Sequence, residues 1–390
     1  MNSTTRLMTL AIAGVVSASA FAQVTDIPAT AHLQESFPVS GTPQVFNPQA
    51  TMAYDNIQGS AYSGFVLSNT GAAGTITRMV GDDVKTRIYA WGKDVNRFWF
   101  SVSNLDTVAF TAPPRVRFYR NNGAGGGPGT YIIGYSFNPI NFNPGTVNTF
   151  FTDITTAGQF VLPADGNMWA CMTFDNASGS TATLANLDQL GQALFNPPAL
   201  GSSQNLGWIS TAAGSFVQND PPGATFTFST PPPVMNVYWG FQTTLDPVTA
   251  TGQILFNNYV AATPSSVNFQ WYDTSSNLVA QQVEAVDPAG NFVADTPATA
   301  GVYQMSMKTG TWLRRTLTID TTAGNVTGLV FNLVNGDANN DNFINSDDFD
   351  ILVANFGGPG PDGDFDGSGS VDSDDFDILV ANFGTDGDGP

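Results

Sequence analysis

The sequence predicts a mainly β protein: an N-terminal β-sandwich of jelly-roll type, a small immunoglobulin-like β-sandwich, and a small α-helical module at the C-terminal end. Charged residues make up only 11% of the chain and hydrophobic residues 42%, with 40 Gly and 24 Pro. That composition is typical of short strands joined by turns. The end of the chain differs, because residues 336–390 hold 14 of the 32 acidic residues and no Lys, Arg or His.

The first 22 residues are expected to be a secretory signal peptide. Arg6 supplies a positive charge, residues 7–16 are mostly apolar, and Ala20-Phe21-Ala22 is a typical cleavage site, so the mature chain is expected to start at Gln23. The apolar run is too short to span a bilayer, and no later segment reaches that length. The protein is therefore expected to be secreted, either free or associated with the cell surface.

Residues 23–245 are predicted to form the first sandwich. Period-two alternation or short apolar runs at 97–102, 115–119 and 224–228 indicate strands, and turn clusters separate them. Cys171 is the only cysteine, so an intrachain disulfide is excluded. It lies in the apolar run 168–174, where an inert core thiol is expected.

Residues 246–334 are predicted to form the second, immunoglobulin-like sandwich. The clearest strands are expected at 253–256, 267–271, 282–286, 302–307 and 316–319, with a turn at Asp287-Pro288-Ala289-Gly290. A domain of this size with this rhythm of strands and turns fits such a sandwich.

Residues 335–390 are predicted to form the helical module. The segment SDDFDILVANFG at 346–357 recurs unchanged at 373–384. Its apolar residues have helical spacing, so two helices are expected to bury them against each other. These residues are Phe349, Leu352, Val353 and Phe356 in the first copy, and Phe376, Leu379, Val380 and Phe383 in the second.

A 12-residue window of oxygen ligands precedes each helix and predicts two calcium ions. Calcium takes six to eight oxygen ligands, and this spacing wraps the chain around one ion. Positions 1, 3, 5, 9 and 12 supply side chains and position 7 a backbone carbonyl. The ligands are Asp337, Asn339, Asp341, Phe343, Asn345 and Asp348 in loop 1, and Asp364, Asp366, Ser368, Ser370, Asp372 and Asp375 in loop 2.

The remaining loop positions fit the same prediction. Position 6 needs a left-handed residue and holds Asn342 in loop 1 and Gly369 in loop 2. Position 8 is Ile344 or Val371, and a short strand pairing between the two loops is expected there. Without calcium the clustered carboxylates repel each other, so metal binding is expected to fold the module.

Residues 335–384 resemble the type I dockerin family, whose calcium loops end in Asp followed four residues later by Leu. Asp348 with Leu352 and Asp375 with Leu379 match that pattern. The resemblance implies calcium-dependent docking onto a cohesin-like or other extracellular protein. It assigns partner contacts to loop positions 10 and 11, which are Ser346, Asp347, Ser373 and Asp374. Cellulosomal members have basic residues further along the helix, and this module has none.

The segment before the module resembles the prealbumin-like or carboxypeptidase-regulatory-like sandwiches of secreted bacterial dockerin-tailed proteins. Tyr303 and the segments 307–314 and 334–337 carry this resemblance. It implies a non-catalytic spacer. A tail that docks onto its own chain, in place of a partner, remains an alternative.

Few residues are available for catalysis. His32 is the only histidine and lies near the expected mature N-terminus, where a mobile segment is expected, so nucleophile–histidine systems lack a base. Glu35 and Glu284 are the only glutamates and fall in different predicted domains. The sequence favours a non-catalytic protein. Some aspartates remain as candidate carboxylates of a hydrolase and are expected at the surface or in turns: Asp82, Asp83, Asp94 and Asp165.

The alternative function is a carbohydrate-binding or hydrolytic component of an extracellular polysaccharide-degrading system, which as an enzyme would be a glycoside hydrolase. Tryptophans could stack on sugars, although such residues are more often core. The acidic balance disfavours nucleic acid as a partner. The tryptophans are Trp91, Trp99, Trp208, Trp239 and Trp271.

Overall fold

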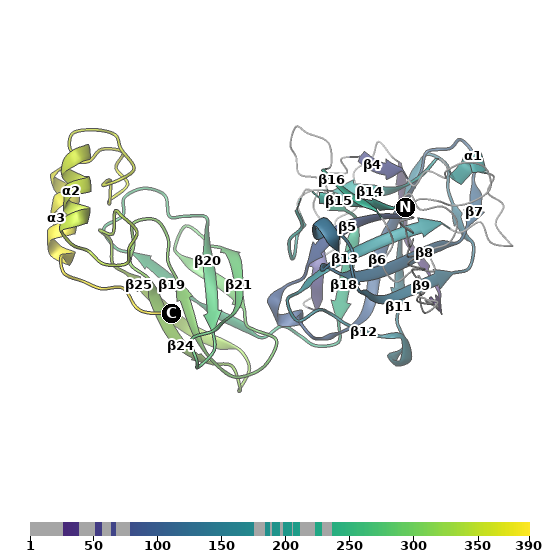
Figure 1. Ribbon diagram of the computed structural model, residues 1–390, viewed down its shortest axis with the longest axis horizontal. Helices are drawn as coiled ribbons and strands as arrows, with labels where there is room; N and C mark the ends of the chain where they lie inside the picture. The colour runs from purple at the N-terminus through teal and green to yellow at the C-terminus, as the bar shows by residue number, and fades with distance from the viewer. Residues whose placement is uncertain are drawn as a thin grey trace, which may run out of the picture.

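The computed structural model describes residues 26–38, 51–56, 64–67, 79–174, 184–187, 189–195, 198–204, 206–210, 223–227 and 236–390. The expected signal peptide lies outside these residues. The described chain is mainly β with two helices at its C-terminal end, which confirms the predicted fold class. Figure 1 shows two lobes, with α2 and α3 at the far end of the second lobe from the N-terminal strands. No helix in the described ranges has the length and apolarity needed to cross a bilayer.

The first lobe is built from two large sheets. One has the order β1 (Ile27–Ala29), β9 (Tyr131–Phe137), β8 (Pro114–Arg120), β13 (Asn167–Phe174), β5 (Met79–Lys85), β15 (Leu206–Ser210) and β16 (Ala224–Thr227). The other has the order β17 (Asn236–Val237), β14 (Leu190–Phe195), β6 (Asp94–Asn104), β11 (Thr146–Asp153) and β2 (His32–Pro38). Strands β12 (Phe160–Val161), β18 (Trp239–Thr243), β3 (Met52–Asp55) and β4 (Gly64–Leu67) also pair within the second sheet. β7 (Phe110–Ala112) pairs with β10 (Ile140–Phe142), and α1 is a single turn at Leu184–Leu187.

Aromatic side chains fill the space between these sheets. Phe98 and Phe118 meet edge to face with ring centroids 5.5 Å apart, and Phe118 also packs edge to face on Trp239 at 5.9 Å. All three side chains are fully buried. Successive side chains of a strand point to opposite faces of its sheet, so every second residue of these strands points into this layer. A chain with few charges and 29 Phe suits a sandwich with such an apolar interior.

Cys171 and His32, the only cysteine and the only histidine of the chain, both lie in strands of the first lobe. Cys171 is fully buried in β13, as predicted for an inert core thiol. His32 does not lie in a mobile segment as expected, because it belongs to β2 and stacks on Phe151 with ring centroids 5.1 Å apart. Pairing of β2 with β11 holds it in the sheet.

The second lobe is a smaller sandwich. Its three-stranded sheet has the order β22 (Asn291–Asp295), β19 (Thr249–Phe256) and β25 (Val326–Leu333). Its four-stranded sheet has the order β21 (Leu278–Ala285), β20 (Ser266–Tyr272), β23 (Val302–Met307) and β24 (Arg315–Asp320). The five predicted strands fall in β19, β20, β21, β23 and β24. Gly290, at φ 85°, closes the predicted turn between β21 and β22.

An ion pair joins the two lobes. Arg87 donates from Nε to Asp295 Oδ2 at 2.7 Å and from Nη2 to Asp295 Oδ1 at 2.5 Å. Asp295 is 5% exposed, so this bidentate contact is largely shielded from water.

Candidate metal centre and exposed helix face

Both acidic loops end in the N-terminal cap of a helix. Loop 1 leads into α2 (Ser346–Asn355) and loop 2 into α3 (Ser373–Asn382). In loop 1, Asn345 Oδ1 accepts from the Asp347 N–H at 2.6 Å, and Asp348 Oδ2 accepts from the Asn345 N–H at 2.8 Å. Loop 2 repeats both bonds with the equivalent residues. These reciprocal capping bonds fix loop positions 9 and 12 relative to each other and start each helix where the sequence repeat begins.

The first position of each loop leaves one carboxylate oxygen for a ligand. Asp337 Oδ2 accepts from the Asn342 N–H at 3.0 Å, and Asp364 Oδ2 accepts from the Gly369 N–H at 2.9 Å. The left-handed conformation of Asn342 (φ 75°) and Gly369 (φ 91°) produces this turn, as predicted. The other oxygen, Oδ1, is buried without a hydrogen-bond partner in both aspartates. A buried anionic oxygen left in this way is costly, and a bound cation removes the cost.

The last position of each loop accepts several backbone N–H groups. Asp375 Oδ1 accepts from Phe365 N at 2.6 Å and Asp366 N at 3.1 Å, and its Oδ2 accepts from Asp372 N at 2.9 Å. In loop 1, Asp348 Oδ1 accepts from Asn339 N at 3.1 Å. Position 12 therefore draws each loop closed around its centre, with carboxylate lone pairs still available to a metal.

Loop 2 gathers three carboxylates. One oxygen each of Asp364, Asp366 and Asp375 lies within 4.8 Å of the other two. Burial raises the pKa of Asp364, and the charges of Asp375 and Asp366 add to the rise. A hard divalent cation such as calcium suits this all-oxygen donor set.

The intermediate loop positions differ between the two copies. Asn339 Nδ2 donates to Asp341 Oδ2 at 2.9 Å, and the Asp341 N–H donates back to Asn339 Oδ1 at 2.9 Å. In loop 2, Ser368 Oγ donates to the Ser370 carbonyl at 3.2 Å. The Ser368 N–H also donates to Asp366 Oδ1 at 2.8 Å, so the side chains at positions 3 and 5 bond within their own loop in both copies.

The expected pairing of Ile344 with Val371 between the two loops is wrong. The Ile344 N–H donates to Thr385 O at 3.0 Å and its carbonyl accepts from Gly384 N at 2.8 Å. Val371 makes the same two bonds with residues that follow α2. Each loop therefore pairs with the segment after the other helix, which requires the two helices to run antiparallel with the loops at opposite ends.

The expected burial of the full apolar stripe of each helix is also wrong. Leu352 and Leu379 are 1% exposed, but the phenylalanines and valines are 37–56% exposed. The helix turns 100° per residue. Position 12, which is Asp348 in loop 1, must face its loop. Leu352 follows Asp348 by four residues, about one helical turn, and therefore also faces inward. Phe349 follows Asp348 by one residue and therefore faces outward. The exposed residues form what is called here the two-helix face: Phe349, Val353, Phe356, Phe376, Val380 and Phe383.

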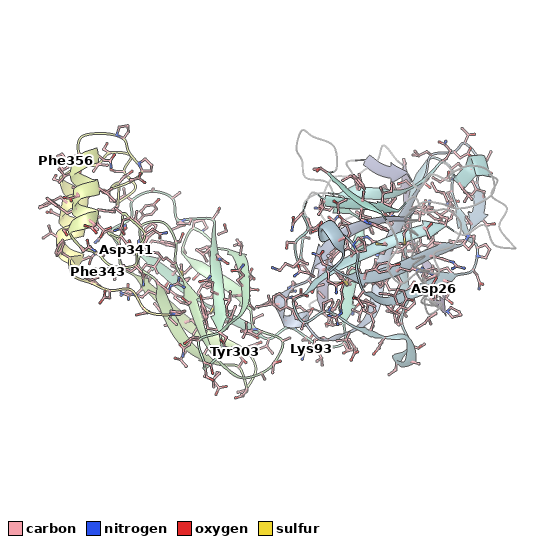
Figure 2. The ribbon with its side chains drawn as sticks, in the orientation of Figure 1. Asp26, Lys93, Tyr303, Asp341, Phe343 and Phe356 are labelled. Atoms are coloured by element: carbon pink, nitrogen blue, oxygen red, sulfur yellow. The ribbon has the colours of Figure 1, made fainter. Side chains whose placement is uncertain are left out.

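The two-helix face spans both helices. The Phe349 and Phe376 rings pack edge to face with centroids 6.2 Å apart, so the two copies meet near its centre. In Figure 2, Phe356 lies at the end of the molecule where α2 and α3 are located. The predicted partner contacts Ser346, Asp347, Ser373 and Asp374 are all exposed. They lie in the first turns of α2 and α3, and therefore at opposite ends of this face.

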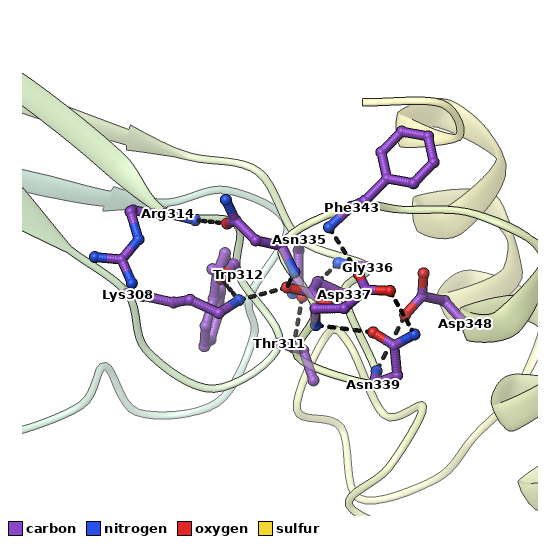
Figure 3. A network of polar contacts seen from close by, with 12 residues as sticks. Lys308, Thr311, Trp312, Arg314, Asn335, Gly336, Asp337, Asn339, Phe343 and Asp348 are labelled. Carbon is purple, nitrogen blue, oxygen red and sulfur yellow. Dashed lines mark hydrogen bonds and ion pairs between the residues drawn. The ribbon is translucent and has the colours of Figure 1, made fainter. Parts of the chain in front are cut away.

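Loop 1 also contacts the second sandwich, through residues that the sequence did not link to the calcium loops. Lys308 Nζ forms an ion pair with Asp337 Oδ2 and donates to Trp312 O at 3.2 Å. The N–H groups of Gly336 and Asp337 donate to Thr311 O at 3.1 and 2.9 Å. Figure 3 shows Lys308 and Thr311 on one side of Asp337 and Asp348 on the other. The sequence analysis placed Lys308 in segment 307–314 but did not link it to loop 1, because it precedes the first ligand by 29 residues.

Four of the five candidate tryptophans are buried. Trp99, Trp208, Trp239 and Trp271 are at most 7% exposed, so they are core residues rather than sugar platforms, and Trp91 is half-buried.

Two of the candidate carboxylates are placed differently from expectation. Asp82 and Asp83 were expected at the surface or in turns, but they lie in β5, fully buried and 8% exposed respectively. Burial and the neighbouring Asp83 charge raise the pKa of Asp82 well above its usual value. Asp82 Oδ2 accepts from the Val237 N–H at 2.7 Å, which ties the two sheets together.

Comparison with known proteins identifies no family: no family model and no curated protein matches. One chain of an interface mutant of the type II cohesin–X-dockerin complex from Acetivibrio cellulolyticus is 19% identical to this protein. The match covers 36% of this protein and 97% of that chain, with a TM-score of 0.28. The major pilin SpaA of Corynebacterium diphtheriae is 11% identical over 77% of this chain and 69% of its own, with a TM-score of 0.18. The Bacillus anthracis TIE protein is 10% identical over 77% of this chain and 57% of its own, with a TM-score of 0.15. Similarities this low assign no activity to the chain.

Proposed function

We propose that residues 335–390 form a calcium-dependent docking module of a secreted, non-catalytic protein. The observation that carries the calcium part is the matched pair of buried Oδ1 atoms on Asp337 and Asp364, each without a hydrogen-bond partner. Both lie in the position where the loop spacing places an ion. Bound calcium supplies the positive charge that neutralises the clustered carboxylates.

The ligands of the two ions are the loop residues themselves. Positions 1, 3, 5, 9 and 12 supply side-chain oxygens and position 7 supplies its carbonyl. Residues Asp337, Asn339, Asp341, Phe343, Asn345 and Asp348 hold the first ion. Residues Asp364, Asp366, Ser368, Ser370, Asp372 and Asp375 hold the second.

The two-helix face is the proposed docking surface. Exposed apolar side chains gathered over two adjacent helices are typical of protein interaction sites. Exposed Asp347, Asp350, Asp374 and Asp377 accompany these side chains on the same two helices, and residues 336–390 hold no basic residue. The partner is therefore expected to offer an apolar patch with a basic rim. A cohesin-like domain is the partner class that the dockerin resemblance implies, with Ser346, Asp347, Ser373 and Asp374 at the rim.

Among the described residues, the contacts of the module with its own chain leave this face uncovered. Contacts within the chain run through the loops and the tail, where Thr316 N donates to Asp388 Oδ2 at 2.9 Å. The phenylalanines and valines of the two-helix face remain exposed beside those contacts. The described residues thus support docking in trans.

The test is calcium titration of the full mature chain, followed by binding to purified type I and type II cohesin domains. Two bound ions are expected, with slower hydrogen exchange in α2 and α3 on binding. A Phe349→Ser/Phe376→Ser variant is expected to bind calcium normally and to lose cohesin binding. Leu278→Ser, at a 50% exposed position on the second sandwich, is the matched control. A chain that binds no calcium, or whose α2 and α3 exchange equally fast with and without it, contradicts the proposal.

A further inference from the structure

The two loops share one ligand pattern but differ in charge. Loop 1 holds the carboxylates of Asp337, Asp341 and Asp348, with amides at positions 3 and 9. Loop 2 holds four carboxylates, because positions 3 and 9 are Asp366 and Asp372. The charge of loop 1 is reduced further by a lysine from outside the module.

Lys308 supplies this charge from the end of the second sandwich. It follows β23 directly and is 14% exposed, and its Nζ pairs with Asp337, which is fully buried. In the described part of the chain, no Lys or Arg forms an ion pair with a loop 2 carboxylate. The second sandwich therefore adds to the charge difference that the two loop sequences already carry.

The ammonium leaves the metal position open. Asp337 Oδ2 receives both Lys308 Nζ and the Asn342 N–H, while Oδ1 is the buried oxygen without a partner. Lys308 is also fixed by its bond to Trp312 O at 3.2 Å. An ion bound through Oδ1 of Asp337 would thus be separated from the fixed positive charge of Lys308 only by the Asp337 carboxylate.

We propose that Lys308 acts as a built-in cation that holds loop 1 in its folded form before calcium binds and weakens calcium binding there, so that loop 2 fills first. This inference rests on the proposed calcium function. Repulsion between a divalent ion and a fixed, largely buried ammonium lowers the affinity of loop 1 by at least about tenfold. The same contact compensates Asp337 when no ion is present, a compensation that loop 2 lacks.

Calcium titration calorimetry on the full mature chain tests the affinity difference. Wild type is expected to show one tight and one weak ion, and Asp364→Asn is expected to remove the tight one. Lys308→Met should tighten the weak site at least about tenfold and leave the tight site unchanged. Lys308→Gln keeps an N–H donor for Trp312 O and should change the two calcium affinities in the same way as Lys308→Met. Lys93→Met, in the first lobe, is the control and should change neither site.

Hydrogen exchange in chelator tests the structural half. In wild type, the N–H of Ile344 in loop 1 is expected to exchange more slowly than the equivalent N–H of Val371 in loop 2. Lys308→Met should remove this difference, and calcium should restore protection in both loops.

Two equal affinities in wild type, or Lys308 variants that leave the weak site unchanged or weaker, would overturn the inference. Equal exchange of the two loops in chelator would overturn it as well. These outcomes leave calcium binding intact, whereas a chain that takes up no calcium refutes the proposed function itself.

Discussion

Asp375→Asn and Asp364→Asn are expected to separate the structural role of a loop carboxylate from its role toward calcium. Asp375 accepts three backbone N–H groups, from Phe365, Asp366 and Asp372. Asp364 accepts one, from Gly369. Both substitutions should abolish calcium binding at loop 2, but only Asp375→Asn should also destabilise the loop without calcium.

The magnitude follows from the bonds that each amide can keep. A hydrogen bond to a charged acceptor contributes about 1.5–3 kcal/mol. Asparagine at 375 can orient one oxygen toward these donors, but its NH2 group then faces at least one backbone N–H. The expected cost in chelator is about 2–4 kcal/mol, which speeds exchange of the α3 amides about 30- to 700-fold. Asparagine at 364 keeps its single bond, so its cost in chelator should stay below about 1 kcal/mol.

Hydrogen exchange of a peptide covering α3, in chelator and in saturating calcium, is the assay. Asp374→Asn, at an exposed position in the same helical turn, is the matched control and should change little in either condition. Equal exchange rates for Asp375→Asn and Asp374→Asn in chelator would show that the three backbone bonds contribute nothing, and the reasoning would fail.

Three further predictions concern the rest of the chain. Phe356→Ser with Phe383→Ser should change the free energy of unfolding by no more than about 1 kcal/mol in urea titrations, because these side chains are 56% and 53% exposed. Burial raises the pKa of Glu284 to about 7 from 4.5, so the folded state holds this proton to higher pH than the unfolded state and stability falls as pH rises from about 5 to 7. Glu284→Gln should flatten that fall, by no more than about 3 kcal/mol, in denaturation at pH 5 and pH 7.5. Gly81→Ala places a Cβ 2.4 Å from Cys171 Sγ and should cost about 1–3 kcal/mol by thermal melting, most of which Cys171→Ala should recover.

The sequence predicted the parts of the module that depend on short spacings. The start of each helix at the repeat and the left-handed conformation of Asn342 depend only on residues within one loop. Capping and turn chemistry act over three to five residues, which a sequence displays directly.

Contacts between distant segments were not predictable in the same way. Helical spacing places Phe349 and Leu352 on the same apolar stripe, but it does not predict which of the two side chains another segment buries. Ile344 at position 8 indicates a short strand without identifying Thr385 as its partner. Asp82 resembled a surface residue because nothing local to it shows the Val237 N–H on the facing sheet.

The two loops contact the second sandwich, so calcium bound as proposed would act on this junction as well as on the module. Leu313, from the connection between β23 and β24, is fully buried in the same cluster as Leu352 and Phe365. Loop 1 contacts the sandwich at Thr311 and Lys308. Loop 2 contacts it at Val260, whose N–H donates to Asp366 O at 2.7 Å. These contacts attach opposite ends of the antiparallel helix pair to the sandwich. If the two loops bind ions as proposed, ordering of both loops would fix how the helices are held against the sandwich and would leave the two-helix face exposed.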